Sequence, residues 1–190
     1  GYPVVASEIN ETLLKKGLGG IDSFLVRSVE KGRMTQQEKE AIMSRIKGTT
    51  NTRDFADCDL VIEATVENMD IKKKVFVELD KIVPKHALLA TNTSCLSITD
   101  LGMLTGRPDK VLGLHFFNPV PLMKLLEIVR TINTSDETLE IGKAFGQSVG
   151  KTIIVAPDTP GFIVNRLLMP FMLAAFRMLE SGIATKEDID

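Results

Sequence analysis

Short apolar runs alternate with amphipathic segments along most of this 190-residue chain. Between several of the runs, at about residues 10–30, 72–83 and 136–149, apolar side chains recur at helical spacing. Parallel strands connected by crossover helices form a sheet that is covered on both faces. The pattern therefore predicts an α/β fold with a doubly wound, mostly parallel sheet. The expected strands lie at residues 2–7, 59–64, 87–91, 111–114, 125–129 and 152–156.

A proline- and glycine-rich segment, Pro157–Gly161, interrupts this alternation, and a long apolar stretch follows it. We therefore expect a domain boundary, with a sheet-containing domain at residues 1–157 and the start of an all-helical domain at 158–190. Residues 10–48 are expected to form a helical hairpin, whose second helix opens with a capping box at Thr35 and ends near Gly48. The chain starts without Met and ends in a polar, helix-like run, so we read it as a fragment of a longer protein.

Composition argues against several kinds of partner. The net charge is −2, the basic residues are scattered, and there is one Tyr and no Trp, which argues against nucleic acid. No apolar run approaches the ~20 residues of a membrane span, so no membrane partner is expected. Two cysteines, Cys58 and Cys95, and two histidines are too few and too dispersed for a disulfide framework or a metal site. A reducing compartment fits this cysteine usage best.

Polar residues follow several of the expected strands, where an open parallel sheet binds ligands. A single polar residue after a strand usually caps a helix or forms a turn. Polar residues after several strands in succession are more than turns require, so they favour a binding site. Glu8, which follows the first expected strand, could accept hydrogen bonds from the adenosine ribose of NAD. Alternatively, its negative charge could simply stabilise the N-terminus of the helix that follows. The residues concerned are Glu8, Glu67, Asn68, Asn92, Thr93, Ser94, His115 and Asn118.

The glycine fingerprint of a dinucleotide-binding loop does not stand before Glu8. Gly17–Asp22 resembles it superficially, but Asp22 occupies the place of the third glycine and the run lies within a helical pattern, so we reject it. If Glu8 contacts NAD, the phosphate loop belongs to the roughly 25 residues before Gly1, the size of one strand–helix unit.

His115 ends a strand-like run, and Glu127 lies twelve residues later within another apolar run. A carboxylate in a buried strand is costly unless it is paired. Two strands joined by a turn would bring the pair together as a general base held by an acid, although His115 could also be a hydrogen-bonded core histidine. His86 lies in a helix-to-strand loop and is expected to be inert. Asn165 either caps a helix or donates to the site from the second domain.

Several runs of this chain match a family pattern in order and spacing. They are residues 61–68 (VIEATVEN), 91–94 (TNTS), 113–119 (GLHFFNP) and 158–166 (DTPGFIVNR). The chain resembles the L-3-hydroxyacyl-CoA dehydrogenases, especially the bacterial 3-hydroxybutyryl-CoA dehydrogenase type, along its whole length. The resemblance implies a Rossmann-like NAD-binding domain without its first strand and glycine loop, followed by a truncated helical domain. Cys95 departs from the family, in which a second serine is common.

The resemblance also implies roles. His115 would take the 3-hydroxyl proton, Glu127 would orient its imidazole, and Ser94 and Asn165 would hydrogen-bond the substrate. Lys31, or its neighbour Arg33, at the hairpin tip would meet a coenzyme A phosphate. The resemblance further assigns the nicotinamide-ribose side of NAD to Glu67, Lys72, Asn92, Ser94 and Asn118, close backbone approach to Ala64, and the adenosine ribose to Glu8.

The expected activity is NAD-dependent oxidation of L-3-hydroxyacyl-CoA in fatty acid or butanoate metabolism. The expected partners are an acyl-CoA substrate and, for the parent protein, a second copy bound through the helical domain. Localisation would be cytoplasmic in a bacterium and mitochondrial or peroxisomal in a eukaryote. Two alternatives stay open: a related dehydrogenase of free 3-hydroxyacids, which uses a catalytic lysine, and a non-catalytic, crystallin-like or inactive fragment.

Overall fold

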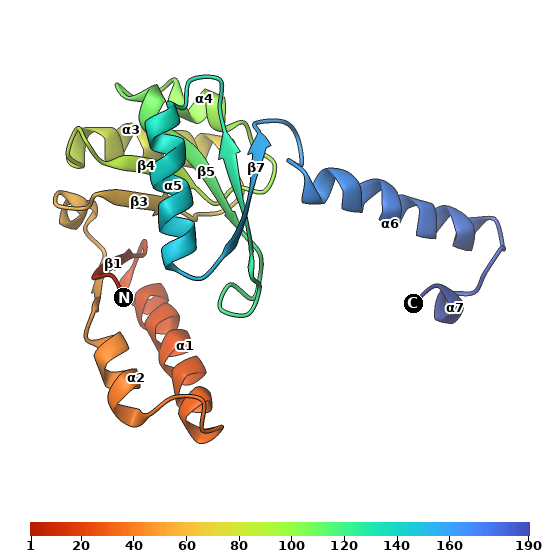
Figure 1. The fold of residues 1–190 in the computed structure, drawn as a ribbon, viewed down its shortest axis with the longest axis horizontal. Coiled ribbons are helices and arrows are strands. Elements are labelled where there is room, and N and C mark those ends of the chain that lie inside the picture. Colours follow the sequence, from red (N-terminus) through yellow and green to blue (C-terminus); the bar gives the residue numbers. More distant parts are fainter. The chain divides into compact units, whose positions relative to one another are not determined.

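The computed structural model describes residues 1–190, which divide into two compact units (Figure 1). One unit comprises Gly1–Cys58 with Lys81–Pro84, and the other comprises Asp59–Asp80 with Lys85–Asp190.

The first unit pairs two strands and a helical hairpin. Its elements in chain order are β1 (Val4–Ser7), α1 (Glu11–Glu30), α2 (Gln36–Met43), β2 (Ile46–Thr49) and the 3₁₀ turn η1 (Thr52–Phe55). The expected capping box opens α2, because the Thr35 hydroxyl accepts from the Glu38 amide while the Glu38 carboxylate accepts from the Thr35 amide. Strands β1 and β2 pair in parallel, from Val4 opposite Ile46 to Ser7 opposite Thr49.

The end of the hairpin corrects one expectation. The second helix was expected to run to about Gly48, but α2 ends at Met43 and residues 46–49 form β2. The strand exists because its backbone pairs with β1, a partner about forty residues earlier in the chain. Gly48 suits this packing, since a Cβ atom there would lie 2.9 Å from Leu18 Cδ1 of α1.

The second unit carries a five-stranded sheet in the order β3-β4-β5-β6-β7. All neighbours pair in parallel except β5 and β6, which are antiparallel. This arrangement confirms the expected α/β class with a mostly parallel sheet, although β1 pairs only with β2 and not with this sheet. The strands are β3 (Leu60–Glu63), β4 (Leu88–Thr91), β5 (Val111–Phe116), β6 (Leu125–Arg130) and β7 (Thr152–Pro157). The helices are α3 (Met69–Ile82), α4 (Ile98–Gly102), η2 (Pro108–Lys110), α5 (Asp136–Ser148), α6 (Val164–Glu180) and α7 (Lys186–Ile189).

The two faces of β5 and β6 have different surroundings. One face belongs to an apolar core beneath α5, where a Cβ on Gly146 would lie 2.8 Å from Leu126 Cδ2. Strand residues alternate between faces, so Gly113, His115 and Glu127 point to the other one. There a Cβ on Gly113 would lie 2.5 Å from Ile98 Cδ1, which shows how closely α4 covers this face. The apolar core contains Leu88, Ala90, Leu112, Leu114, Leu126, Ile128 and Leu139.

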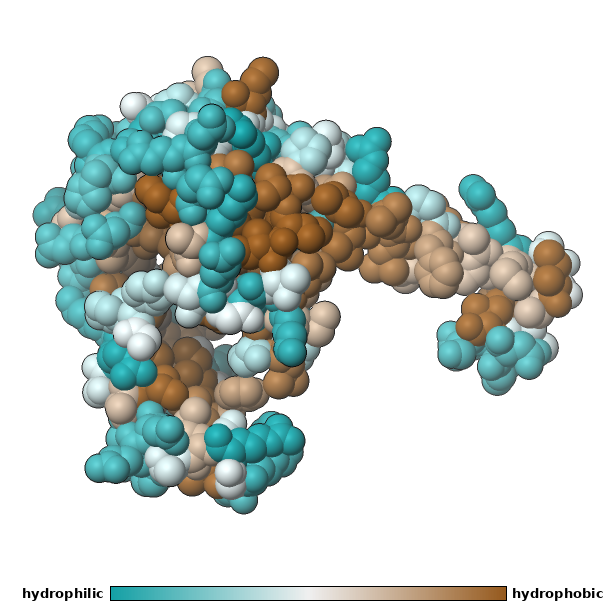
Figure 2. All heavy atoms as spheres, viewed as in Figure 1, coloured by the Kyte–Doolittle hydropathy of each residue, from teal (hydrophilic) through white to brown (hydrophobic).

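Helix α6 has no buried residue in the described chain. Its exposed apolar side chains include Leu167, Phe171 and Phe176, and Figure 2 shows hydrophobic surface along this helix. No helix combines the length and apolar character that crossing a membrane requires.

Candidate active site

His115 and Glu127 form a buried pair on adjacent strands. The antiparallel register of β5 and β6 sets the two residues directly opposite each other, and His115 Nδ1 lies 2.7 Å from Glu127 Oε2. Directly paired side chains point to the same face, so the register alone brings them together. His115 is 4% exposed and Glu127 is fully buried. The expectation that these two residues meet is confirmed.

The second oxygen of Glu127 is bound at the start of α6. Oε1 accepts hydrogen bonds from the backbone amides of Ile163, at 3.1 Å, and Val164, at 3.0 Å. The amides at a helix N-terminus carry partial positive charge and stabilise a carboxylate there. Glu127 therefore acts as an acceptor on both oxygens, and the His115 Nδ1–H donates to it. This arrangement leaves Nε2 as the ring nitrogen for a ligand.

Two aromatic rings pack against the imidazole of His115. The Phe117 ring centroid lies 4.6 Å away, and that of Phe162 lies 5.5 Å away with its ring edge-on. Phe162 is itself buried and adopts a left-handed backbone conformation with φ of 48°. These contacts restrict the orientations that the imidazole can adopt.

Glu67 organises the loop that follows β4. Its Oε1 accepts from the Thr93 hydroxyl at 2.5 Å and from the Ser94 amide at 2.8 Å. Burial raises the pKa of Glu67, but these bonds and Lys72 outweigh it and hold the pKa below its ordinary value. Asn165 reaches the same loop, where its Nδ2 donates to the Ser94 carbonyl at 3.5 Å. The structure thus brings Glu67, Ser94 and Asn165 together.

Lys72 lies beneath this loop in a buried ion pair that sequence analysis did not anticipate. Its Nζ is 2.9 Å from Glu63 Oε1 and 3.4 Å from Glu67 Oε2. Burial raises the pKa of the Glu63 carboxyl, but hydrogen bonds from Thr65, Thr91 and Lys72 outweigh it and leave the pKa lowered. The signal that could have revealed Glu63 was an acid ending an apolar run with a lysine nine residues later. Lys72 remains a predicted cofactor residue, acting next to Glu67.

The other predicted cofactor and substrate residues are distributed as follows. Asn92 is half-buried, and its Oδ1 accepts from the Phe116 amide at 2.8 Å, which ties β4 to β5. Ala64 and Asn118 are exposed; Ala64 directly follows β3, and Asn118 is the second residue after β5. Glu8 and Lys31 are exposed in the first unit, where the Glu8 amide donates to the Thr49 carbonyl.

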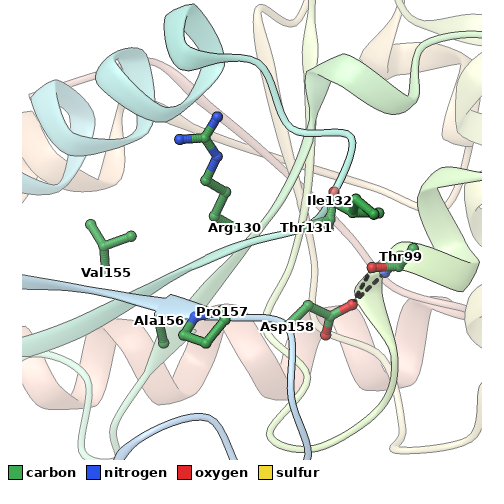
Figure 3. A pocket seen from close by; sticks show the side chains of 8 residues that line it. All are labelled: Thr99, Arg130, Thr131, Ile132, Val155, Ala156, Pro157 and Asp158. Carbon is green, nitrogen blue, oxygen red and sulfur yellow. Dashed lines mark hydrogen bonds between the residues drawn. The ribbon is translucent and has the colours of Figure 1, made fainter.

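A separate cavity of about 480 Å³ opens where β6 and β7 end (Figure 3). It contains neither His115 nor Glu127, and its single carboxylate, Asp158, is bonded to Thr99. Its lining residues are Thr99, Arg130, Thr131, Ile132, Val155, Ala156, Pro157 and Asp158. No group of three or more His, Cys, Asp or Glu side chains is arranged to hold a metal ion.

A mostly parallel sheet with polar side chains after its strands, and with a buried histidine–carboxylate pair, is an arrangement that a nicotinamide-dependent dehydrogenase requires. Comparison with known protein families identifies the particular family of dehydrogenases. Residues 1–159 match the family described as 3-hydroxyacyl-CoA dehydrogenase, NAD binding domain, and residues 161–190 match the corresponding C-terminal domain. The chain belongs to the 3-hydroxyacyl-CoA dehydrogenase family of NAD-dependent oxidoreductases.

Individual relatives agree with this assignment. The chain is 44% identical over 190 residues to a probable 3-hydroxybutyryl-CoA dehydrogenase of Deinococcus radiodurans, covering all of this chain and 68% of that protein. It is 42% identical to a 3-hydroxybutyryl-CoA dehydrogenase of Bradyrhizobium diazoefficiens, covering all of this chain and 65% of that protein. The crystal structure of M. tuberculosis FadB2 superposes with a TM-score of 0.97 at 41% identity, over 100% of this chain and 67% of that one. The chain thus spans about two thirds of the length of these relatives.

Proposed function

We propose that this chain carries the catalytic groups of a dehydrogenase that oxidises an L-3-hydroxyacyl-CoA, of the 3-hydroxybutyryl-CoA type, to the 3-ketoacyl-CoA. The observation that carries the proposal is the 2.7 Å hydrogen bond between His115 and the buried Glu127. Such a pair is the arrangement that a general base needs when it removes a proton from a secondary alcohol. The relatives named above are 3-hydroxybutyryl-CoA dehydrogenases, which supports a short acyl chain.

In this mechanism His115 takes the proton of the substrate 3-hydroxyl on Nε2. Its Nδ1–H keeps the bond to Glu127, whose negative charge stabilises the imidazolium that forms. Oε1 of the same carboxylate stays bound to the α6 amides, so Glu127 does not need to move as His115 becomes charged. Ser94 and Asn165 bind the substrate oxygens and hold C3 close to the base.

NAD, when bound, supplies the acceptor for the hydride that leaves C3. The residues present fit it, because a partly exposed carboxylate, Glu67, and the polar Asn92, Ser94 and Asn118 stand after three successive strands. Carboxylate and amide groups suit ribose hydroxyls and a carboxamide. Ala64 presents a small, exposed residue after β3. In the first unit, taken by itself, Glu8 is an exposed carboxylate after β1, which suits the hydroxyls of the adenosine ribose.

The test is the oxidation of NADH by acetoacetyl-CoA, measured in the longest form of the protein that can be expressed. His115→Ala should lower kcat by ~10² or more, because the proton donor of this reverse reaction is lost. His86→Ala is the matched control, since the His86 side chain is two-thirds exposed and bonded only to the exposed Asp59. Equal turnover in His115→Ala and His86→Ala would refute the assignment of the base.

The substrate class is tested by exchanging acetoacetyl-CoA for free acetoacetate. A coenzyme A substrate predicts turnover of the thioester and little of the free acid. Preference for the free acid would instead support the 3-hydroxyacid dehydrogenases. NADH binding without turnover of either substrate would support a non-catalytic protein.

We also propose that the protein forms a homodimer through its helical domain. The proposal follows from the family resemblance, and the surface it would use is the exposed apolar face of α6, where Leu167 and Phe171 are more than 70% exposed. Sedimentation equilibrium should give twice the monomer mass, and Phe171→Glu should reduce it to that of the monomer. A monomeric protein would refute the proposal.

A further inference from the structure

The segment from Asp158 to Val164 is held at both of its ends by carboxylates. At its far end the Ile163 and Val164 amides donate to Glu127, as described above. At its near end, Asp158 itself is the acceptor. Asp158 Oδ2 accepts from the Thr99 amide at 2.7 Å and from the Thr99 hydroxyl at 2.6 Å (Figure 3), and Oδ1 accepts from the Ile98 amide at 3.3 Å.

Helix α4, which donates hydrogen bonds to Asp158, is firmly packed against the sheet. Ile98 and Leu101 of α4 are fully buried, and Ile98 Cδ1 sits over Gly113 of β5. The Asp158 amide also donates to the Arg130 carbonyl at the end of β6. Asp158 is therefore tied both to α4 and to the strand that carries Glu127.

The middle of the segment is a left-handed turn. Gly161 has φ of 76° and Phe162 has φ of 48°, and the Phe162 amide donates to the Thr159 carbonyl. A bulky residue in this region is strained and persists only where its surroundings hold it. The turn directs the Phe162 ring onto His115 and the next two amides onto Glu127.

We propose that Asp158 is a positioning residue for the His115–Glu127 pair, a role that rests on the proposed function. Its bonds to α4 fix the left-handed turn, and the turn fixes both the amides on Glu127 Oε1 and the ring against His115. Without this anchor, the buried Glu127 carboxylate loses the geometry of its amide donors. The imidazole it holds then loses its orientation, and a misplacement of about 1 Å can reduce turnover by up to ~10².

The test combines kinetics with a direct view of His115. Asp158→Ala should lower kcat by roughly 10- to 10²-fold, with KM for acetoacetyl-CoA changed by less than about threefold. In the proton NMR spectrum, the Nδ1–H of His115, hydrogen-bonded to a carboxylate, should give a far-downfield signal. That signal should move upfield or disappear through exchange in Asp158→Ala. Its loss in His115→Ala but not in His86→Ala assigns the signal, because the His86 side chain is exposed.

Asp136→Asn is the matched control. Asp136 is an exposed aspartate bonded to Arg130 near the same end of β6, so its loss should change neither the signal nor kcat. If Asp158→Ala does not fold, Thr99→Val removes one donor to Asp158 and should produce a smaller change of the same kind. An unchanged His115 signal in a folded Asp158 or Thr99 variant would overturn the proposal. The signal does not depend on turnover, so this failure is distinguishable from failure of the proposed activity.

Discussion

Removing the charge of Glu63 should be among the most destabilising single changes in the sheet-bearing unit. The Glu63 and Lys72 side chains are 0% and 1% exposed, so solvent does not screen their interaction. Glu63 Oε1 accepts from the Thr65 amide and hydroxyl, each at 2.6 Å, and Oε2 accepts from the Thr91 hydroxyl at 2.7 Å. In Glu63→Gln an NH₂ group replaces one of these acceptors, and Lys72 loses its buried counter-charge.

The expected cost follows from this geometry. Breaking a buried ion pair by removing one partner costs about 3–5 kcal/mol, because the other charge loses its buried partner; Lys72 then keeps only the partly exposed Glu67, at 3.4 Å, as a counter-charge. Lys72→Met should cost less, about 1–3 kcal/mol, since Glu63 keeps its Thr65 and Thr91 donors. In the double variant no uncompensated charge remains. The double variant should therefore be more stable than the sum of the two single effects by about 0.5–3 kcal/mol.

Urea unfolding monitored by circular dichroism measures these differences. With a urea m-value of about 2 kcal/mol per M, Glu63→Gln should lower the midpoint by about 2 M. Glu180→Gln, at the exposed end of α6, is the control with the same change of charge and should shift stability by less than about 0.5 kcal/mol. A loss below about 1 kcal/mol in Glu63→Gln, or strictly additive single effects, would refute the reasoning.

Two further predictions concern packing and pH. Gly113→Ala places a Cβ 2.5 Å from the buried Ile98 and should lower the free energy of unfolding by about 1–3 kcal/mol, whereas Gly17→Ala, with nothing within 4 Å, should raise it by roughly 0.5–1 kcal/mol. Urea unfolding measures both changes, and an unchanged free energy of unfolding in Gly113→Ala would contradict the close approach of α4 to β5. Burial raises the pKa of Asp80, but a backbone N–H and the Arg107 guanidinium outweigh it and hold the pKa below its ordinary 3.8. The ionised Asp80 carboxylate contributes its full stabilisation above pH 3.8, and this contribution is lost as the pH falls through the lowered pKa. The difference in free energy of unfolding between the wild-type protein and Asp80→Asn should therefore shrink below about pH 4. Urea unfolding at several pH values measures this difference, and a difference that does not change with pH would contradict the prediction.

Sequence analysis predicted the sheet well where strand signals are local. The apolar runs at 111–114 and 125–129 lie within β5 and β6, and the helix expected at 136–149 matches α5. The His115–Glu127 pair was also predictable, because a carboxylate inside an apolar run requires a buried partner. Their catalytic roles, like the domain boundary at residue 157, remain predictions.

Other features escaped because they depend on residues distant in the chain. Residues 46–49 carry no strong strand signal, and they become β2 only through pairing with β1. Helix α4 is five residues long, too short for a periodic pattern, and it is stabilised by its packing on β5 and by Asp158. The Glu63–Lys72 pair joins a strand to the following helix and has no signature apart from its spacing.

The sequence alone determined which groups the candidate site contains: a histidine, a carboxylate and a set of polar residues placed after apolar strands. Local pattern reveals this because strand periodicity and the cost of burying charge act over a few residues. The tertiary structure decided the geometry of those groups. The antiparallel register of β5 and β6 sets His115 opposite Glu127, and the turn at Phe162, anchored by Asp158, brings backbone amides to the same carboxylate. These contacts join residues up to sixty positions apart, so only the folded chain, which holds all of them at once, can specify them.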